Sequence, residues 1–190
     1  MDDIAKLRSV VDELQERLRE EVQLRTELER RCHLLEKLAY RDPSSGLRTE
    51  TYLHARVREE IDRSIRYPAS ATLVTLCAPS GVDEMVPKLG MRLTGELRAT
   101  DQVFSLSKQG LAILLVETPE DGARKALDRL QTDIERFIRG YGFTVTTFPV
   151  DANQAEDFLN LALERHQQVV RQMHAEPSAT TGGVTAQQVH

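Results

Sequence analysis

The feature that most constrains this chain is a heptad repeat over residues 1 to 40. The segment is rich in Glu, Arg and Leu, and it contains neither glycine nor proline. Nine of the eleven a and d positions carry an apolar residue or a cysteine, and a seam of this length predicts a coiled coil. The a positions are Ile4, Val11, Leu18, Arg25, Cys32 and Ala39, and the d positions are Leu7, Leu14, Glu21, Leu28 and Leu35.

Charged residues beside this seam favour a parallel homodimer in register. In that arrangement Asp3 at a g position faces Arg8 at an e position of the second helix, and the two charges attract. Glu21 and Arg25 interrupt the seam and could pair across the interface, which would specify register at some cost in stability. The alternative is a single amphipathic helix that lies on its own domain. We favour the dimer because about forty residues of polar-flanked helix have little other surface to pack against.

Composition limits what the rest of the chain can be. With 190 residues and 40% hydrophobic content, the chain can form one globular domain and an extension. The net charge of −5 does not favour a nucleic-acid partner. The sequence has no signal-peptide core and no apolar run that would span a membrane, so we expect a cytoplasmic protein. Cys32 and Cys77 lack metal-ligand spacing and are expected to be reduced and structural.

Hydrophobic periodicity divides residues 41–173 into alternating helices and strands. Pro43 and Gly46 break the chain after the N-terminal helix. Helices are expected at about 49–66, 82–100, 118–137 and 153–173, and strands within 69–77, 103–106, 111–116 and 143–148. Thr118 is expected to cap the third of these helices, with Asp121 completing a capping box. This order predicts a mixed α/β (α+β) sandwich with one sheet covered by helices. Residues 174–190 have the composition of a disordered tail.

The most informative part of this domain lies between residues 97 and 115. Here a helix end is followed by a short strand, a tight turn ending at Gly110 and a buried strand. Arg98 and Asp101 stand immediately before the hairpin. An arginine can grip the O6/N7 edge of guanine or a phosphate, and an aspartate can accept hydrogen bonds from guanine N1–H and N2–H₂. Their spacing of three predicts that both side chains lie on one face at the helix end.

Taken in order, these motifs resemble a GGDEF (diguanylate cyclase) domain behind a coiled-coil linker. Residues 41–47, reading RDPSSGL, resemble the opening R-D-x-L-T-G-L signature of the family. Arg98 and Asp101 match its RxxD product-inhibition motif, and residues 107–111 (Ser107, Lys108, Gln109, Gly110 and Leu111) occupy the place of the GGDEF pentapeptide. The resemblance covers residues 38 to 173. It implies a palm-type mixed sheet covered by helices, with a cyclic di-GMP site at Arg98 and Asp101.

The departures from the family pattern concern the metal side of the site. Cyclases of this family hold two divalent cations with carboxylates from the end of the first strand and from the hairpin. Here Cys77 stands at the strand end, and Gln109 and Gly110 stand where the two acidic residues belong. Ser107 and Lys108 replace the two glycines. We therefore expect no enzymatic activity, no metal and no cofactor other than a cyclic di-GMP ligand.

Three functions remain open on the sequence alone. In the first, the chain is a dimeric signalling or scaffold module that receives cyclic di-GMP through Arg98 and Asp101 and acts on a partner protein. In the second it is a pure protein-interaction scaffold, because a short RxxD motif can also be an ordinary surface ion pair. In the third it is a residual diguanylate cyclase.

Overall fold

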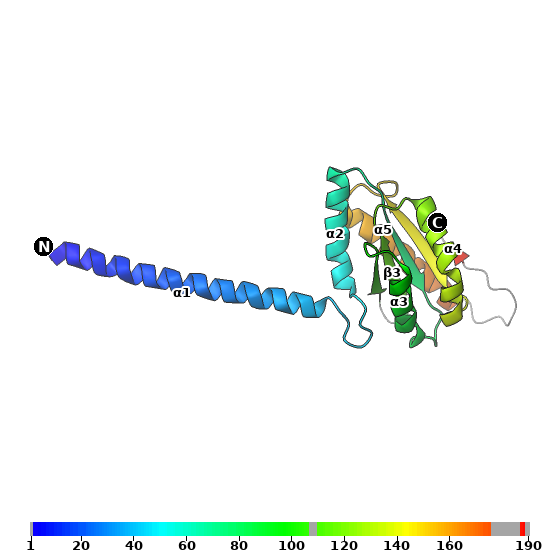
Figure 1. The fold of residues 1–190 in the computed structure, drawn as a ribbon, viewed down its shortest axis with the longest axis horizontal. Helices are drawn as coiled ribbons and strands as arrows, with labels where there is room; N and C mark the ends of the chain where they lie inside the picture. The colour runs from blue at the N-terminus through cyan, green and yellow to red at the C-terminus, as the bar shows by residue number, and fades with distance from the viewer. Residues whose placement is uncertain (1, 107–109, 176–186, 189–190) are drawn as a thin grey trace. The chain divides into compact units, whose positions relative to one another are not determined.

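The computed structural model describes residues 2–106, 110–175 and 187–188 of the chain (Figure 1). It divides into two compact units, Met1–Ala39 and Tyr40–His190. Among the described residues, no helix is both long enough and apolar enough to cross a membrane.

The first unit is one continuous helix, α1 (Asp2–Ala39). Arginine–glutamate pairs four residues apart line its polar surface, as between Arg17 and Glu13 at 2.7 Å. Arg25, which the sequence suggested as a partner of Glu21 across a dimer, pairs with Glu29 of its own helix at 3.1 Å. The described apolar residues from 14 to 35 are 52 to 64% exposed, so within this unit the seam is uncovered. These residues are Leu14, Leu18, Val22, Leu24, Leu28 and Leu35. The helix is present as expected, and its pairing with a second copy stays a prediction.

The second unit is built on one sheet with the strand order β2-β3-β1-β4-β5. The four longer strands pair antiparallel, and the two-residue strand β5 runs parallel to β4. The central strands β1 and β3 are buried along their whole length. The strands are β1 (Ala71–Cys77), β2 (Gln102–Leu106), β3 (Gly110–Leu115), β4 (Gly142–Phe148) and β5 (Gln187–Gln188).

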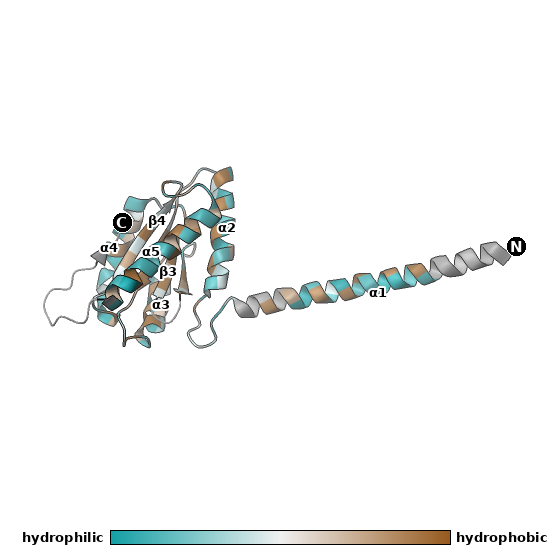
Figure 2. Ribbon diagram, turned by 180° about the vertical axis from the view of Figure 1, so that it is seen from behind, coloured by the Kyte–Doolittle hydropathy of each residue, from teal (hydrophilic) through white to brown (hydrophobic). Residues whose placement is uncertain are grey.

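Two pairs of helices cover the two faces of the sheet. α2 (Glu50–Arg66) and α5 (Ala155–Ala175) pack on one face, and α3 (Met85–Glu96) and α4 (Glu120–Phe137) pack on the other. These helices carry both hydrophobic and hydrophilic residues, as expected for elements with one buried side (Figure 2). The architecture confirms the expected mixed α+β fold with a sheet between helices.

Alternation along β1 divides the core into two clusters. Val74 and Leu76 face α3 and α4, whereas Leu73 faces α2 and α5. Two threonines of β1 point into the interior and pair with threonines of β4. The hydroxyls of Thr75 and Thr144 are 2.8 Å apart, so this buried polar pair satisfies itself.

Several boundaries differ from the sequence prediction. α3 ends at Glu96, four residues early, because Leu97 is extended and the next residues form a turn. The expected capping box of α4 is wrong: the N-cap residue is Pro119, and the Thr118 hydroxyl instead donates to the Val116 carbonyl at 2.8 Å. The helix begins one residue later than the sequence suggested, so Thr118 lies before the cap, in the turn that precedes α4.

The C-terminal segment was expected to be disordered from residue 174. In the structure α5 continues through Ala175, and Gln187 pairs with Gly142 at the edge of β4. Residues 176–186 and 189–190 lie outside the described part, and for them disorder stays a prediction.

Candidate functional site

Arg98 and Asp101 lie in the turn that joins α3 to β2. The backbone N–H of Asp101 donates to the Arg98 carbonyl at 3.0 Å, the hydrogen bond that closes a β-turn. The prediction that both residues lie on one face of a helix end is therefore wrong, because the helix has already ended at Glu96. The first and last residues of a β-turn are nevertheless close neighbours. The turn thus brings the two residues together, as the motif requires, by a different local structure.

Asp101 also holds the far end of the hairpin. One of its carboxylate oxygens, Oδ1, accepts a hydrogen bond from the backbone N–H of Val116 at 3.2 Å. Val116 follows β3 directly and leads into the connection to α4. Asp101 therefore fixes the start of this connection through one of its two carboxylate oxygens. Arg98, by contrast, is exposed and has no ion pair among the described residues.

Both residues line a cavity of about 290 Å³ at the start of α4. Lys125 and Arg129 of α4 line the same cavity, so three cationic side chains meet there. Sequence reasoning did not find these two residues. Their spacing of four places them on the same face of α4, but only the packing of α4 brings that face to the Arg98 turn. The remaining lining residues include Glu117, Thr118 and Gly122.

The opening signature, residues 41–47, forms a compact turn whose last residue, Leu47, packs in the core of the domain. Asp42 accepts hydrogen bonds from the Ser44 backbone at 3.0 Å and from the Ser45 hydroxyl at 2.7 Å, and these bonds lower the pKa of its carboxyl. Gly46 has a φ of +69°, which glycine adopts without strain. Leu47 is buried in the core beneath it. In this chain, the signature therefore has a clear structural role.

The two metal-side positions that the family resemblance points to meet across the sheet. Cys77, the last residue of β1, is directly opposite Gly110, the first residue of β3. Cys77 is buried, and desolvation raises the pKa of its thiol to about 11, so the thiol is neutral near pH 7. Neither residue offers a carboxylate oxygen. Ser107, Lys108 and Gln109 of the hairpin lie outside the described residues.

Acidic side chains gather in a separate cavity of about 590 Å³ near the starts of α2 and α3. Its wall includes the carboxylates of Asp42, Glu50, Asp83 and Glu84. Within the described part of the chain, no group of three or more His, Cys, Asp or Glu side chains is arranged to hold a metal ion.

Gly110 is in close contact with a buried histidine from α5. A Cβ atom at Gly110 would lie 2.7 Å from His166 Nε2 and 2.6 Å from the Leu106 carbonyl oxygen, too close for any side chain. His166 is 7% exposed, and burial lowers the pKa of its imidazole to about 4. Its Nδ1 atom is buried and has no hydrogen-bond partner among the described residues. His166 is therefore a neutral side chain packed against the start of β3.

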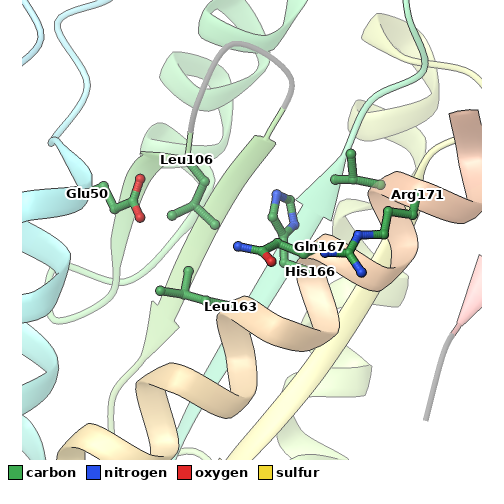
Figure 3. A pocket seen from close by; sticks show the side chains of 7 residues that line it. Glu50, Leu106, Leu163, His166, Gln167 and Arg171 are labelled. Carbon is green, nitrogen blue, oxygen red and sulfur yellow. The ribbon is translucent and has the colours of Figure 1, made fainter.

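The same histidine borders a cavity of about 320 Å³ between α5, the start of α2 and the end of β2 (Figure 3). Gln167 and Arg171 of α5 and Glu50 of α2 supply its polar groups. Leu106, Leu163 and Val170 supply an apolar wall. None of these residues was singled out as a site by its pattern in the sequence.

Comparison with known proteins finds similarity at the level of structure. No family model and no curated protein matches the sequence. Among solved structures, the diguanylate cyclase SiaD in complex with its activator SiaC from Pseudomonas aeruginosa is 19% identical, with a TM-score of 0.59 over 86% of this chain and 73% of that chain. The FimX GGDEF domain from Pseudomonas aeruginosa is 15% identical, with a TM-score of 0.62 over 79% and 99% of the two chains.

A third similar structure describes an interaction between a microbial GGDEF domain and bis-(3′,5′)-cyclic di-GMP. It is 16% identical to this chain, with a TM-score of 0.62 over 73% of this chain and 94% of the other. At these identities the likeness concerns the fold. The globular unit has the fold of a GGDEF domain.

Proposed function

We propose that this chain is a cytoplasmic GGDEF-like signalling module that does not synthesise cyclic di-GMP and binds it at the Arg98–Asp101 turn. The observation that carries the proposal is the convergence of this turn with Lys125 and Arg129 on one cavity. Cyclic di-GMP has two guanines and two phosphates. The Arg98–Asp101 turn matches a guanine, and the two α4 cations match the phosphates.

Each side chain has a distinct part in this proposal. Arg98 presents its guanidinium plane to the O6/N7 edge of a guanine or stacks on the base. The Asp101 carboxylate accepts hydrogen bonds from the N1–H and N2–H₂ groups of the same guanine. Lys125 and Arg129 neutralise phosphate charge. The cavity, about 290 Å³, is at the lower limit of small-molecule pockets, so it takes one guanine while the rest of the ligand lies over α4.

The absence of synthesis is proposed from the residues that meet at the hairpin. A neutral buried thiol at Cys77 and a glycine at position 110 are poor ligands for Mg²⁺, which needs hard oxygen donors. Two-metal phosphoryl transfer requires both ions at once, so loss of either carboxylate position removes the catalyst.

Two of the similar structures support a signalling role, one through a nucleotide and one through an activator. One of them describes an interaction between a microbial GGDEF domain and cyclic di-GMP, and another describes the diguanylate cyclase SiaD in complex with its activator SiaC. We propose that α1 pairs with a second copy as a parallel coiled coil and that a partner protein reads the dimer. The exposed apolar seam of α1 supports this assembly.

The proposal is tested by calorimetric titration of the full chain with cyclic di-GMP. The parent is expected to bind, and Arg98→Ala and Arg129→Ala are each expected to weaken binding, since a charge-assisted hydrogen bond is worth about 1.5–3 kcal/mol. Arg136→Ala removes the same charge from the exposed end of α4, outside the cavity, and should bind as the parent does. No heat at high micromolar ligand would exclude the receptor function.

The second candidate function is a scaffold that binds only proteins. The uncovered seam of α1 favours it independently of any nucleotide. A chain that dimerises through α1 but gives no signal with cyclic di-GMP would be assigned to this class.

A further inference from the structure

β4 lies at the outer side of the sheet, and the two-residue strand β5 lies beyond it (Figure 1). A strand in this position has backbone N–H and C=O groups that point away from the sheet and can pair with another segment of chain. Every second residue of a strand points these groups to the same side. The partners of the outward groups of β4 therefore indicate which part of its edge is closed and which part is open to pairing.

An arginine and an aspartate close the C-terminal half of this edge. Arg165 of α5 donates to the Val145 carbonyl at 3.0 Å and pairs with Asp151 at 3.0 Å. The Asp151 carboxylate accepts from the Thr147 N–H at 2.7 Å, and the Asp151 N–H donates to the Thr147 carbonyl at 2.8 Å. These bonds occupy the Val145 carbonyl and both backbone groups of Thr147, with which an added strand would otherwise pair.

The N-terminal half of the edge carries a strand from the end of the chain. Gln187 is paired with Gly142, and Gln188 is paired with Phe143, in a parallel arrangement. Since the Val145 carbonyl points outward, the backbone groups of Phe143, two residues earlier, point outward as well. The N–H and C=O of Phe143 therefore face β5.

Apolar side chains flank this end of β4 on both faces of the sheet. Phe143 packs against the core cluster to which α3 and α4 contribute. Gly142 faces α5, where a Cβ atom on this glycine would lie 2.3 Å from Val169 Cγ1 and 3.0 Å from Met173 Sδ. A segment that joins the sheet here therefore finds apolar neighbours for its side chains on either face.

Two paired residues hold β5 only weakly at this edge. Strands in globular proteins usually have about 3 to 10 residues, and one backbone hydrogen bond adds little net stability in water. Residues 176–186 connect α5 to β5, and closing a connection of this length costs conformational entropy. We therefore expect β5 to leave and rejoin the edge, unlike the central strands β1 and β3.

We propose that the Gly142–Phe143 end of the β4 edge is a docking site for an extended peptide segment, and that the C-terminal segment of this chain is its reversible occupant. The segment joins the sheet as a parallel strand, a mode of recognition in which main-chain hydrogen bonds supply the affinity. Arg165 limits the length of the site, because it occupies the next outward carbonyl. The proposal does not rest on cyclic di-GMP binding, because the described lining of the Arg98 cavity comes from other elements.

Amide hydrogen exchange of the full chain, followed by NMR, tests the docked strand. Combining Gln187→Pro with Gln188→Pro removes the backbone donors of β5 and should undock it. The Phe143 N–H should then exchange about threefold faster or more, the effect of losing one backbone hydrogen bond. Replacing both glutamines by alanine is the matched control, because it keeps the donors and should leave the rate unchanged. The Thr144 N–H, which points to β1, should exchange equally in all three proteins.

A peptide with the sequence of residues 184–190, VTAQQVH, tests the same site in trans. At millimolar concentration it should shift the Phe143 amide signal of the double-proline variant. It should shift that signal less in the parent, because the parent's own segment occupies the edge. A peptide in which proline replaces both glutamines should shift neither protein.

Three results would overturn the proposal. The first is equal exchange of the Phe143 N–H in the parent and the double-proline variant. The second is equally fast exchange in the double-proline and double-alanine variants, which would assign the effect to the glutamine side chains. The third is no shift of the double-proline variant by the peptide. In that case, a higher mass of this variant than of the parent in light scattering would assign the open edge to a second copy of the chain.

Discussion

The carboxylate of Asp101 is hydrogen-bonded to the backbone N–H of Val116, at 3.2 Å, so a residue expected to bind a ligand also holds the end of β3. Two substitutions of Asp101 distinguish its role in ligand binding from its hydrogen bond to Val116. Asp101→Asn keeps an oxygen that can accept from Val116 but loses the charge, whereas Asp101→Ala loses both.

We expect Asp101→Ala to lower the free energy of unfolding by about 1–3 kcal/mol, because it leaves the Val116 N–H without a partner. Asp101→Asn should stay within about 1 kcal/mol of the parent and still weaken cyclic di-GMP binding. Urea unfolding and calorimetry measure the two effects. Equal destabilisation by both variants would show that the charge, and not the hydrogen bond, supports this turn.

Gly110 should not tolerate a side chain. Its Cβ would meet the Leu106 carbonyl oxygen at 2.6 Å and the His166 ring at 2.7 Å. We expect Gly110→Ala to destabilise the domain by about 1–3 kcal/mol, as overpacking does. Gly95→Ala is the matched control: it lies in α3, a Cβ there would have no atom within 4 Å, and the change should stabilise by about 0.5–1 kcal/mol. Thermal unfolding of both variants measures the difference.

Restoring one acidic residue at the hairpin should not restore catalysis. Gly110→Glu places a carboxylate opposite Cys77, which still offers no oxygen ligand, and it adds the same steric clash. We expect no turnover of GTP with Mg²⁺ by either the parent or this variant, and lower stability for the variant. Turnover by the parent that a chelator abolishes would contradict the proposed loss of activity.

Stability should fall below neutral pH because of His166. Burial lowers the pKa of its imidazole to about 4, below the ordinary value of about 6.5, so the folded state binds this proton less readily than the unfolded state. The contribution of neutral His166 to the free energy of unfolding is fully present above pH 6.5. It decreases by about 1.4 kcal/mol per pH unit as the pH falls towards 4. Urea unfolding at pH 7.5 and pH 5 measures the loss.

The matched variants for this effect are His166→Leu and His174→Gln. His166→Leu should remove most of the difference between the two pH values, whereas His174→Gln, at an exposed position of α5, should keep it. An unchanged pH dependence in His166→Leu would assign the effect to other groups.

Dimerisation should depend on α1. Deleting residues 1 to 38 should give a monomer with an intact globular unit, because that unit has its own two core clusters. In a parallel dimer in register, Cys32 at an a position faces its copy, so mild oxidation should link two chains and Cys32→Ser should prevent it. Light scattering measures the mass of the truncated chain, and non-reducing gels detect the cross-linked dimer. A truncated chain that stayed dimeric would place the interface in the globular unit.

Local patterns in the sequence were sufficient to predict α1 to α5 and β1 to β4 and the order in which they occur, but not the two-residue strand β5. The heptads predicted α1, and the apolar run at Leu111 and the β-branched residues after Ala71 predicted the central strands. The pair Arg98 and Asp101 was found because its members are three residues apart, and a turn keeps such neighbours close as well as a helix does. Hydrophobic periodicity and short spacings depend on nearby residues, so the sequence carries them directly.

Contacts between distant residues were decided by the tertiary structure. Only the packing of α4 brings Lys125 and Arg129 to Arg98, and only the register of the sheet sets Cys77 opposite Gly110. The approach of His166 to Gly110 spans 56 residues and has no local signal. Sequence by itself therefore determined which elements form and which charged pair stands before the hairpin. The cavities and their cationic walls arise only when helices pack on the two faces of the sheet, because side chains far apart in the chain meet only there.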